Sequence, residues 1–515
     1  MKITRRTFLK MAGATAAATA FAPGTRFLSA PAIIHAQETI TIGINAWVTS
    51  LDAQTQSGPS NVGYRIYGLM HDSLLQIGRD GQPEGLLATA WENDGNQWRF
   101  TLREGVVFHD GTTMTADDVV FSLERMMDPQ YQGIGLTVGP YLASVEATDE
   151  LEITITTPAP DPLLPYRLAN YWVNIMPRAG VEAAGFDAMQ ANPIGAGPYK
   201  VVEFTPDRLV LEQHSEYWGG TPAAGEIILR YIPENAIRVS ALQAGEVDMI
   251  TNVPIDQLDA LESDGDLQVV STNLFNFMNV LFNTTAGVTA DVNVRRALSM
   301  AIDRQAIVDQ LFGGRVRAMT DYLLPGTLGF DESRPVLTYD PEAAAAALAE
   351  SSYNGELLSF TPPVGYYVNS ELVTQVVNQM WQAIGVNTEL APMEMGAYGQ
   401  AYYSGAVSAT IQSLDSFGDP VTSLLYIWTA GSSNFFSSFY YPQPAEFDES
   451  MATLSTAFDP EIRTTEIRKV ISILERDMPF TPIYQTADYF AMRQGITWQP
   501  HPLFYVDLRP NNFSL

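Results

Sequence analysis

The chain has 515 residues, 46% of them hydrophobic, a length and composition that suit about three folded domains with sizeable cores. Its formal net charge of −30 at pH 7 excludes binding to DNA or to anionic membranes through the net field of the protein. It contains no cysteine, which excludes disulfides, thiolate metal sites and cysteine nucleophiles.

The first 36 residues have the pattern of an export signal. Arg5 and Arg6 precede the apolar run Met11–Ala22, and Ala36 offers a small residue at a cleavage point. We expect a twin-arginine signal over residues 1–36, export of the folded chain and a periplasmic product. A lipid-anchored product needs a cysteine at its new N-terminus, so we expect no lipid anchor.

The signal segment contains five of the 28 basic residues and no acidic one. The remainder therefore carries 23 basic and 58 acidic residues, a net charge near −35. Because these charges are spread over a mixed sequence, they predict an acidic globular surface and no acidic tail.

Alternation of apolar and polar residues predicts five strands after the signal segment. Each alternating run is six or seven residues long, within the usual range for a strand. The predicted strands are Thr39–Ile44, Gln97–Leu102, Glu150–Thr156, Arg208–Gln213 and Glu226–Tyr231.

Apolar residues at helical spacing predict four helices, interleaved with the strands, so we expect an α/β fold class. Thr115 is expected to cap the first helix, with Asp118 favouring its N-terminal dipole. The second is expected to end at Gly313 and Gly314. The apolar stripes are Val119, Leu123 and Met126; Val294, Leu298, Ala301 and Val308; Val373–Ile384, ended by Gly385; and Ile467–Leu474.

Two segments predict special backbone geometry. Phe108–Gly111 is expected to turn between a strand and a helix, with Gly111 free to take a positive φ. Asn192–Pro198 is expected to be a rigid, glycine-containing crossing between domains, ahead of a strand at Tyr199. No Gly-Lys-Ser/Thr or nucleotide fingerprint accompanies these glycines, so we expect no phosphate site there.

Four segments of the chain, taken together, identify a family. They are Leu87–Trp91 leading into Trp98–Gly111, Thr115–Leu123, Asn192–Tyr199 and Val294–Arg304. In this order and spacing they resemble the family-5 extracellular solute-binding proteins, which are the receptors of ABC importers for peptides, nickel and related solutes. The likeness covers essentially the whole chain after the signal segment.

The resemblance implies a bilobed periplasmic-binding-protein-like fold with an extra domain on lobe one. Lobe two is expected over 273–477 and the extra domain over 56–189. A hinge is expected to close the lobes around a solute held in the cleft between them. Lobe one is expected to combine residues 37–55, 190–272 and 478–515.

The same resemblance implies a function. The protein is expected to capture a peptide-like or other small polar solute and to deliver it to an ABC permease in the inner membrane. The expected partners are that permease and a small-molecule solute, either a peptide, a sugar or an amine. We expect a monomer, with no cofactor, no metal and no nucleic acid.

Signs of catalysis are missing from the sequence, and we expect no enzyme. No histidine has a partner at metal-ligand spacing, and there is no Gly-x-Ser-x-Gly elbow. Abundant acids, such as Asp415 and Asp419, leave a secreted hydrolase as the alternative of another class. We expect His109 to be structural. The histidines after the signal segment are His71, His109, His214 and His501.

Lobe two has an unusual composition. The 128 residues from Pro335 to Ile462 contain 14 acidic residues, many aromatic ones and no Lys, Arg or His. In the peptide receptors of the family, this lobe supplies an Asp to the α-amine of the ligand. The matching segment is Ser413–Pro420, where Ser416 falls on the family position and Asp415 lies one residue away.

A ligand carboxylate therefore lacks a local basic partner, unless Arg295, Arg296 or an arginine of lobe one provides it. Rings beside carboxylates suit sugars or cationic groups, so an oligosaccharide or cationic-solute receptor is the alternative within the class. We expect a neutral or cationic ligand. The candidate ligand-binding residues are Asn45, Ala46 and Trp47 after the first strand, and Asn279, Tyr367, Asp415, Phe417, Asp419, Trp428, Phe436 and Tyr441 in lobe two.

Overall fold

The structure is a computed structural model, and contacts define residues 38–515 as one compact unit. Asn61, Asp415 and residues 426–428 are described by their backbone alone. None of the described helices is long and apolar enough to cross a bilayer. The described residues are 38–55, 61–128, 138–334, 336–364, 369–415, 418–428 and 440–515.

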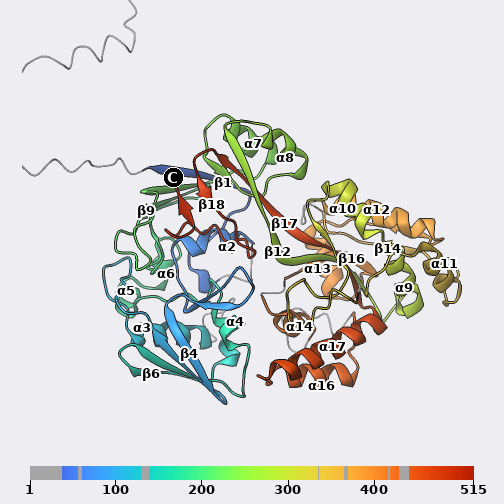
Figure 1. The fold of residues 1–515 in the computed structure, drawn as a ribbon, viewed down its shortest axis with the longest axis horizontal. Helices are drawn as coiled ribbons and strands as arrows, with labels where there is room; N and C mark the ends of the chain where they lie inside the picture. Colours follow the sequence, from blue (N-terminus) through green and yellow to red (C-terminus); the bar gives the residue numbers. More distant parts are fainter. Residues whose placement is uncertain are drawn as a thin grey trace, which may run out of the picture. The chain divides into compact units, whose positions relative to one another are not determined.

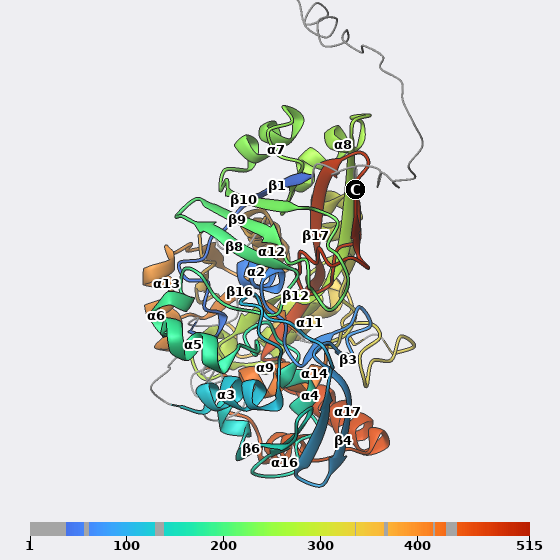
Figure 2. The same cartoon turned by 90° about the vertical axis from the view of Figure 1, so that its left-hand side faces the viewer.

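The largest sheet has 11 strands and runs through both lobes (Figure 1). In lobe one, β1 lies between β10 and β11 and is parallel to both, and β9 and β8 extend the sheet beyond β10 (Figure 2). The buried Ile40 and Ile42 of β1 explain why the alternating run forms a strand at the core. The lobe-one strands are β1 (Thr39–Ile44), β8 (Tyr199–Phe204), β9 (Arg208–Gln213), β10 (Glu226–Tyr231) and β11 (Met249–Ile250).

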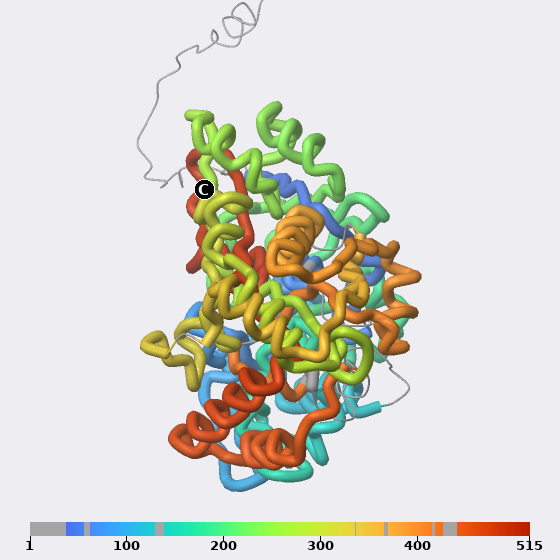
Figure 3. The backbone as a smooth tube through the Cα atoms, turned by 90° about the vertical axis from the view of Figure 1, so that its right-hand side faces the viewer, coloured from blue at the N-terminus to red at the C-terminus, as the bar shows by residue number. Residues whose placement is uncertain are grey.

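The lobe-two part of the sheet has apolar clusters on both faces. Met278 and Val280 of β12 pack in one cluster with α9, α10 and α12, whereas Phe277 and Leu281 pack in the other with α14, α16 and α17. Helices α16 and α17 pack side by side and are the orange-red pair of Figure 3. The strands are β12 (Leu267–Phe282), β13 (Arg317–Ala318), β14 (Leu358–Phe360), β15 (Thr388–Leu390), β16 (Ala409–Asp415) and β17 (Phe480–Arg493); the helices are α9 (Val292–Met300), α10 (Arg304–Phe312), α11 (Pro341–Ala349), α12 (Ser370–Ala383), α13 (Met395–Tyr403), α14 (Pro420–Trp428), α16 (Ala445–Leu454) and α17 (Pro460–Asp477).

Strands β12 and β17 connect the two lobes (Figure 1). Their antiparallel register shifts between the pairs Asn273–Ala487 and Phe277–Gln485, a bulge that bends the ladder. On one side of this shift β17 also pairs with β11, and on the other side β12 also pairs with β16. Residues Phe480–Gln485 thus pair with strands β12 and β13.

The extra domain shares one continuous apolar cluster with lobe one, which includes Ile42 of β1 and Phe100 of β5. Its own sheet has the order β4-β5-β7-β6. The strands are β2 (Leu75–Ile77), β3 (Pro83–Gly85), β4 (Ala88–Asp94), β5 (Gln97–Leu102), β6 (Ser144–Asp149) and β7 (Glu152–Thr156); the helices are α2 (Asn61–Ile66), α3 (Ala116–Met127), α4 (Leu164–Leu168), α5 (Arg178–Ala184) and α6 (Phe186–Met189). Lobe one adds α7 (Asn235–Gln243), α8 (Ile255–Glu262), β18 (Thr497–Trp498) and β19 (Phe513–Ser514).

The junction between the extra domain and lobe one explains the glycines of the Asn192–Pro198 crossing. A Cβ on Gly195 would lie 2.1 Å from the carbonyl oxygen of Met70, and one on Gly197 would lie 2.4 Å from the Met70 carbonyl carbon. These glycines therefore allow close backbone packing, whereas Gly111 has the positive φ, +85°, that the sequence predicts.

His109 is structural, as expected. Its Nδ1 accepts from the Gly195 N–H at 3.2 Å, and its Nε2 donates to the Gly197 carbonyl at 3.0 Å. The ring of His214 lies edge-on to it, with 5.1 Å between centroids. These contacts fix His109 as one neutral tautomer between the two domains.

Four of the five predicted strands have the predicted bounds, and the fifth begins at Glu152 instead of Glu150. Thr115 caps α3 as predicted and forms a capping box with Asp118, since the Thr115 N–H donates to Asp118 at 2.9 Å. The single helix predicted through Val294 and Val308 is wrong. The chain forms α9 and α10 because the Asp303 carboxylate accepts from the Ala306 N–H and begins a second helix.

Candidate functional site

The candidate site lies where the segment after β1, the middle of β12 and the end of β16 are linked through hydrogen bonds. Asn276 of β12 pairs with Asp415 of β16 and accepts from the Thr486 hydroxyl at 3.0 Å. Two residues further along β17, the Asp488 carboxylate accepts from Arg65, which also donates to Asn45. These contacts connect the candidate residues of lobe one with those of lobe two.

A buried ion pair forms the centre of this connection. Arg65 of α2 contacts Asp488 at 2.5 Å, and their side chains are 5% and 3% exposed. Its other nitrogen donates to Asn45 at 2.7 Å and to the Thr251 hydroxyl at 3.2 Å. Burial raises the pKa of the Asp488 carboxyl, and the positive charge of Arg65 opposes this shift. Residues of lobe one thus hold the guanidinium group of Arg65.

The three candidates after β1 have different environments. Asn45 uses its side-chain oxygen as the acceptor for Arg65. Ala46 is half-buried. The Trp47 indole N–H donates to the Thr205 carbonyl at 3.1 Å, and its ring stacks on Phe204 with 6.3 Å between centroids. Trp47 therefore packs against strands of its own lobe.

Asp419 begins α14 as a buried cap. One carboxylate oxygen accepts from the Val421 N–H at 2.7 Å, and the other accepts from Arg463 of α17 at 2.9 Å. Burial raises the pKa of this carboxyl, and Arg463 opposes the shift. Both oxygens accept hydrogen bonds within lobe two, so Asp419 acts as a capping residue, and its predicted contact with the ligand stays a prediction.

Two further candidates are buried in lobe two, and their predicted contact with the ligand stays a prediction. Asn279 is fully buried and donates to the Gln412 carbonyl at 3.1 Å. Tyr441 is 4% exposed, and its hydroxyl donates to Asp477 at 2.6 Å. Burial raises the pKa of Tyr441. The sequence could not reveal this packing, because the partners are distant along the chain.

The remaining candidates stay predictions. Asp415 ends β16, and Trp428 ends α14, but the structure describes only the backbone of both. Tyr367, Phe417 and Phe436 lie outside the described residues.

The arginines proposed as partners for a ligand carboxylate are engaged elsewhere. Arg295 donates to the backbone carbonyls of Thr289, Ala290, Asp477 and Met478, and Arg296 donates to that of Arg476 at 2.9 Å. Burial lowers the pKa of Arg295 to about 10. Both side chains hold lobe-two segments together, and their role toward a ligand carboxylate stays a prediction.

Contacts between the extra domain and lobe two were not found from the sequence. A Cβ on Gly418 would lie 2.2 Å from the Gly81 carbonyl oxygen, so two backbones touch here. Leu163 of the extra domain is fully buried in a lobe-two cluster, and Tyr166 packs against it. Asp80-Gly81 and Gly418-Asp419 are turn signals in the sequence, but nothing in them indicates that the two turns meet.

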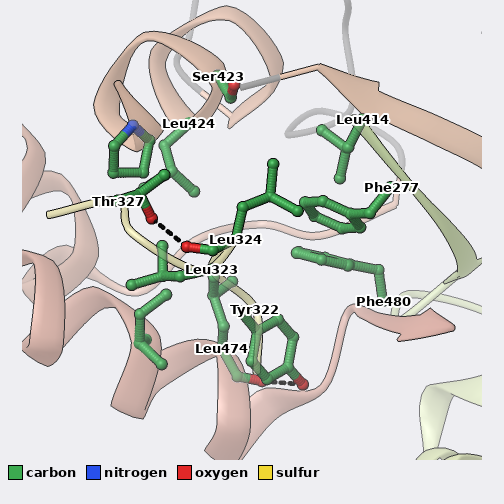
Figure 4. Close-up of a pocket in the computed structure, with 12 residues that line it drawn as sticks. Phe277, Tyr322, Leu323, Leu324, Thr327, Leu414, Ser423, Leu424, Leu474 and Phe480 are labelled. Atoms are coloured by element: carbon green, nitrogen blue, oxygen red, sulfur yellow. Dashed lines mark hydrogen bonds between the residues drawn. The ribbon is translucent and has the colours of Figure 1, made fainter. Parts of the chain in front are cut away.

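An apolar pocket opens beside the start of α14 (Figure 4). Its volume is about 30 Å³. No group of three or more His, Asp or Glu within the described part of the chain could hold a metal ion. The lining residues are Phe277, Tyr322, Leu323, Leu324, Thr327, Leu414, Pro420, Ser423, Leu424, Ile471, Leu474 and Phe480.

The adjacent strands β12 and β17 join two α/β lobes, and candidate ligand-binding residues lie on both lobes. This arrangement defines a periplasmic-type binding protein. The chain belongs to the bacterial extracellular solute-binding proteins, family 5, whose profile matches residues 82–435. The profile of the twin-arginine translocation signal matches residues 2–22, which confirms export by that route. The protein is a periplasmic solute-binding receptor of an ABC importer.

Similar proteins include solute-binding proteins of known name. The heme-binding protein A of Haemophilus influenzae is 28% identical over 441 residues, which are 79% of each chain. The di/tripeptide-binding protein 1 of Pseudomonas aeruginosa is 27% identical over 451 residues, 80% of this chain and 82% of that protein.

Solved structures show the same fold. The substrate-binding protein CtaP of Listeria monocytogenes has a TM-score of 0.84 at 20% identity, with 93% of this chain and 99% of that chain covered. DppA of Helicobacter pylori, solved with the peptide STSA, has a TM-score of 0.77 at 21% identity, with 93% and 98% covered. These matches confirm the predicted bilobed α/β fold.

Proposed function

We propose that this receptor captures a small neutral or cationic solute, and that the solute is peptide-like. The observation that supports this proposal is that two arginines near the candidate residues already form ion pairs within the protein. Arg65 binds Asp488, and Arg463 binds Asp419. An anionic ligand would lose hydration in an acidic protein without gaining a free cation from these residues.

The relatives support a peptide-like ligand. One relative is named for di- and tripeptides, and another is named for heme. An oligosaccharide or amine is the second candidate, because the stretch from Pro335 to Ile462 is rich in aromatic and acidic residues.

We also propose that the binding site forms when the two lobes close. Lobe two moves against lobe one and its extra domain, with the hinge at the register shift between β12 and β17. The boundary within β17 lies after Gln485. The receptor acts as a monomer, remains free of a lipid anchor and carries out no catalytic step.

Two measurements test this proposal. Mass spectrometry of the solute that co-purifies with the protein from the periplasm identifies its chemical class. Thermal-shift titration then compares Ala-Ala amide, Ala-Ala and Ala-Glu, since a ligand stabilises only the state that it binds. We expect the largest shift with the amide, whereas a largest shift with Ala-Glu would contradict a neutral or cationic ligand.

A separate measurement tests the closure of the two lobes around the ligand. Small-angle scattering with a bound ligand should give a smaller radius of gyration than without it. Tight binding with an unchanged scattering curve would contradict the hinge.

A further inference from the structure

The extra domain contacts the part of lobe two that contains α14, α16 and α17. Leu163 is fully buried, and the other buried members of its apolar cluster that the structure describes lie between Phe277 and Phe480. Trp98 of β5 contacts the ring of Phe458, with 5.9 Å between centroids. Figures 1 and 2 show the extra-domain strands β4 and β6 at the same end of the molecule as α16 and α17, away from the strands β12 and β17 that connect the lobes.

The extra domain itself holds Leu163 in place. The Leu163 N–H donates to one carboxylate oxygen of Asp161 at 2.9 Å, and the other oxygen accepts from Arg167 at 3.0 Å. The side chains of this ion pair are 8% and 12% exposed, and the Arg167 guanidinium lies 3.4 Å from the centre of the Tyr141 ring. These partners all belong to the extra domain, so the turn should keep its shape when lobe two moves away.

Lobe two holds Phe458 in a similar way. Phe458 directly precedes Asp459, the N-cap of α17. The Asp459 carboxylate accepts from the N–H groups of Glu461 and Ile462 at 2.8 and 3.2 Å. The Phe458 side chain is 40% exposed although it contacts Trp98, so it lies at the rim of the interface. Both contacts join surfaces that are already ordered, so their formation costs little conformational entropy.

These contacts stabilise the arrangement in which lobe two lies against the extra domain. Movement of lobe two away would expose Leu163 to water and would separate the rings of Trp98 and Phe458. Burial of a leucine side chain gives the larger stabilisation, and the aromatic pair adds a smaller one. Because both contacts join protein to protein, their contribution is the same for every ligand in the cleft.

We infer that Leu163 and Phe458 are positioning residues that form a latch between the extra domain and lobe two. The latch favours the closed arrangement and so raises the affinity for every ligand by one common factor, without selecting among ligands. The inference rests on the proposed function, because it needs lobe two to move against lobe one and its extra domain.

The test is calorimetric titration of the protein with Ala-Ala amide and with Ala-Lys amide. Leu163→Ala should weaken the binding of both amides roughly tenfold, and Phe458→Ala should weaken it roughly threefold. The loss should come from faster dissociation. The ratio of the two affinities should keep its wild-type value. Leu163→Met, which conserves the side-chain volume, should recover most of the affinity.

Leu168→Ala is the matched control. Leu168 is also fully buried and belongs to α4, but it packs in the cluster that the extra domain shares with lobe one. Its truncation should lower the melting temperature without changing either affinity. An equal loss of affinity in Leu168→Ala and Leu163→Ala would show a general destabilisation and would overturn the latch.

A second measurement needs no ligand. The chain has no cysteine, so Glu104→Cys of the extra domain and Glu449→Cys of α16, both at exposed positions, can carry a pair of spin labels. The distance between the labels reports how far lobe two lies from the extra domain. Without ligand, Leu163→Ala should shift the distribution of this distance toward longer values, whereas Leu168→Ala should leave it unchanged.

The outcomes separate the latch from the proposed function. An unchanged affinity in Leu163→Ala, or a changed ratio of the two amides, overturns the latch and leaves the proposed function standing. Failure of both amides to bind, while an acidic peptide binds, overturns the proposed function. The label distances then decide on the latch, and an unchanged distribution in Leu163→Ala overturns it as well.

Discussion

The junction of lobe one with its extra domain and the junction of lobe one with lobe two are built from different contacts. The first has a continuous apolar core and a buried ion pair, in which Arg125 of α3 contacts Asp52 at 2.5 Å. The second consists of the antiparallel strands β12 and β17, with a register shift in their pairing, and of surface ion pairs between Arg315 and α8.

This difference indicates which part moves. Separating the extra domain from lobe one would expose a shared core and an ion pair with side chains 2% and 1% exposed. Bending two strands at a bulge breaks no such ion pair, although it separates Leu163 of the extra domain from its lobe-two cluster. The extra domain is thus expected to move with lobe one, and lobe two to move alone. Four predictions test this comparison.

The largest effect is expected in lobe two. Asp419→Ala leaves Arg463 buried without its carboxylate and should cost about 3–5 kcal/mol. If the lobes unfold independently, calorimetry should show a separate early transition for lobe two, with the other transition unchanged. Asp419→Asn, which keeps an acceptor for the α14 cap, is the milder control. Loss of ligand binding with normal stability would instead place Asp419 in the cleft.

Acid should weaken the first junction. Burial lowers the pKa of His71 to about 4 and that of His109 to about 3, although Asp52 favours the protonation of His71. Below pH 6.5 the unfolded chain binds protons that the folded protein does not, so stability falls as the pH falls from 6.5 toward about 4.

At pH 5 each of these two histidines should contribute a loss of about 2 kcal/mol. Denaturant unfolding between pH 7 and pH 4.5 measures the slope. His109→Gln retains a donor and an acceptor but does not titrate, so its slope should be shallower. An identical slope in the variant would show that His109 does not titrate as its burial requires.

A smaller loss is expected from Gly197→Ala. The new Cβ would lie 2.4 Å from a backbone carbon of Met70, which cannot rotate away, so overpacking should cost about 1–3 kcal/mol. Gly265→Ala is the control, because its Cβ would meet nothing within 4 Å. The melting temperature measures both. A harmless Gly197→Ala would mean that the junction is looser than the structure shows.

The smallest effect on stability is expected at the junction of lobe one with lobe two. Arg315, after α10, contacts Asp259 and Glu262 of α8 at 2.8 Å. These side chains border solvent, so Arg315→Gln should change stability by less than about 1 kcal/mol. Salt should reduce the difference between the two proteins. A loss of several kcal/mol would show that the second junction is as firmly held as the first.

Most of the strands were predictable because they bury alternate residues locally, as Ile40 and Ile42 do. The break between α9 and α10 was not predictable, because the apolar stripe continues through both helices. Asp303 acts as a cap only once the chain turns. The role of Gly111 followed from the turn sequence, whereas that of Gly197 depends on Met70, which is distant along the chain.

The candidate site was less predictable than the fold. Asp419 looks like a ligand acid in the sequence, but Arg463 neutralises it from a helix that follows much later. Tyr441 looks like a cleft aromatic, but its hydroxyl binds Asp477. Such assignments depend on which side chains meet in space, and composition does not contain this information. The correspondence of Ser413–Pro420 with the family located the segment beside the pocket.

The pairing of Asn273 with Ala487 has a topological consequence. The chain leaves lobe one and returns to it at directly opposed positions on neighbouring strands. Lobe two is therefore an insertion into a β-hairpin, and its place could be taken by a two-residue turn. A variant in which such a turn joins Asn273 to Ala487 would therefore contain the first lobe and its extra domain alone.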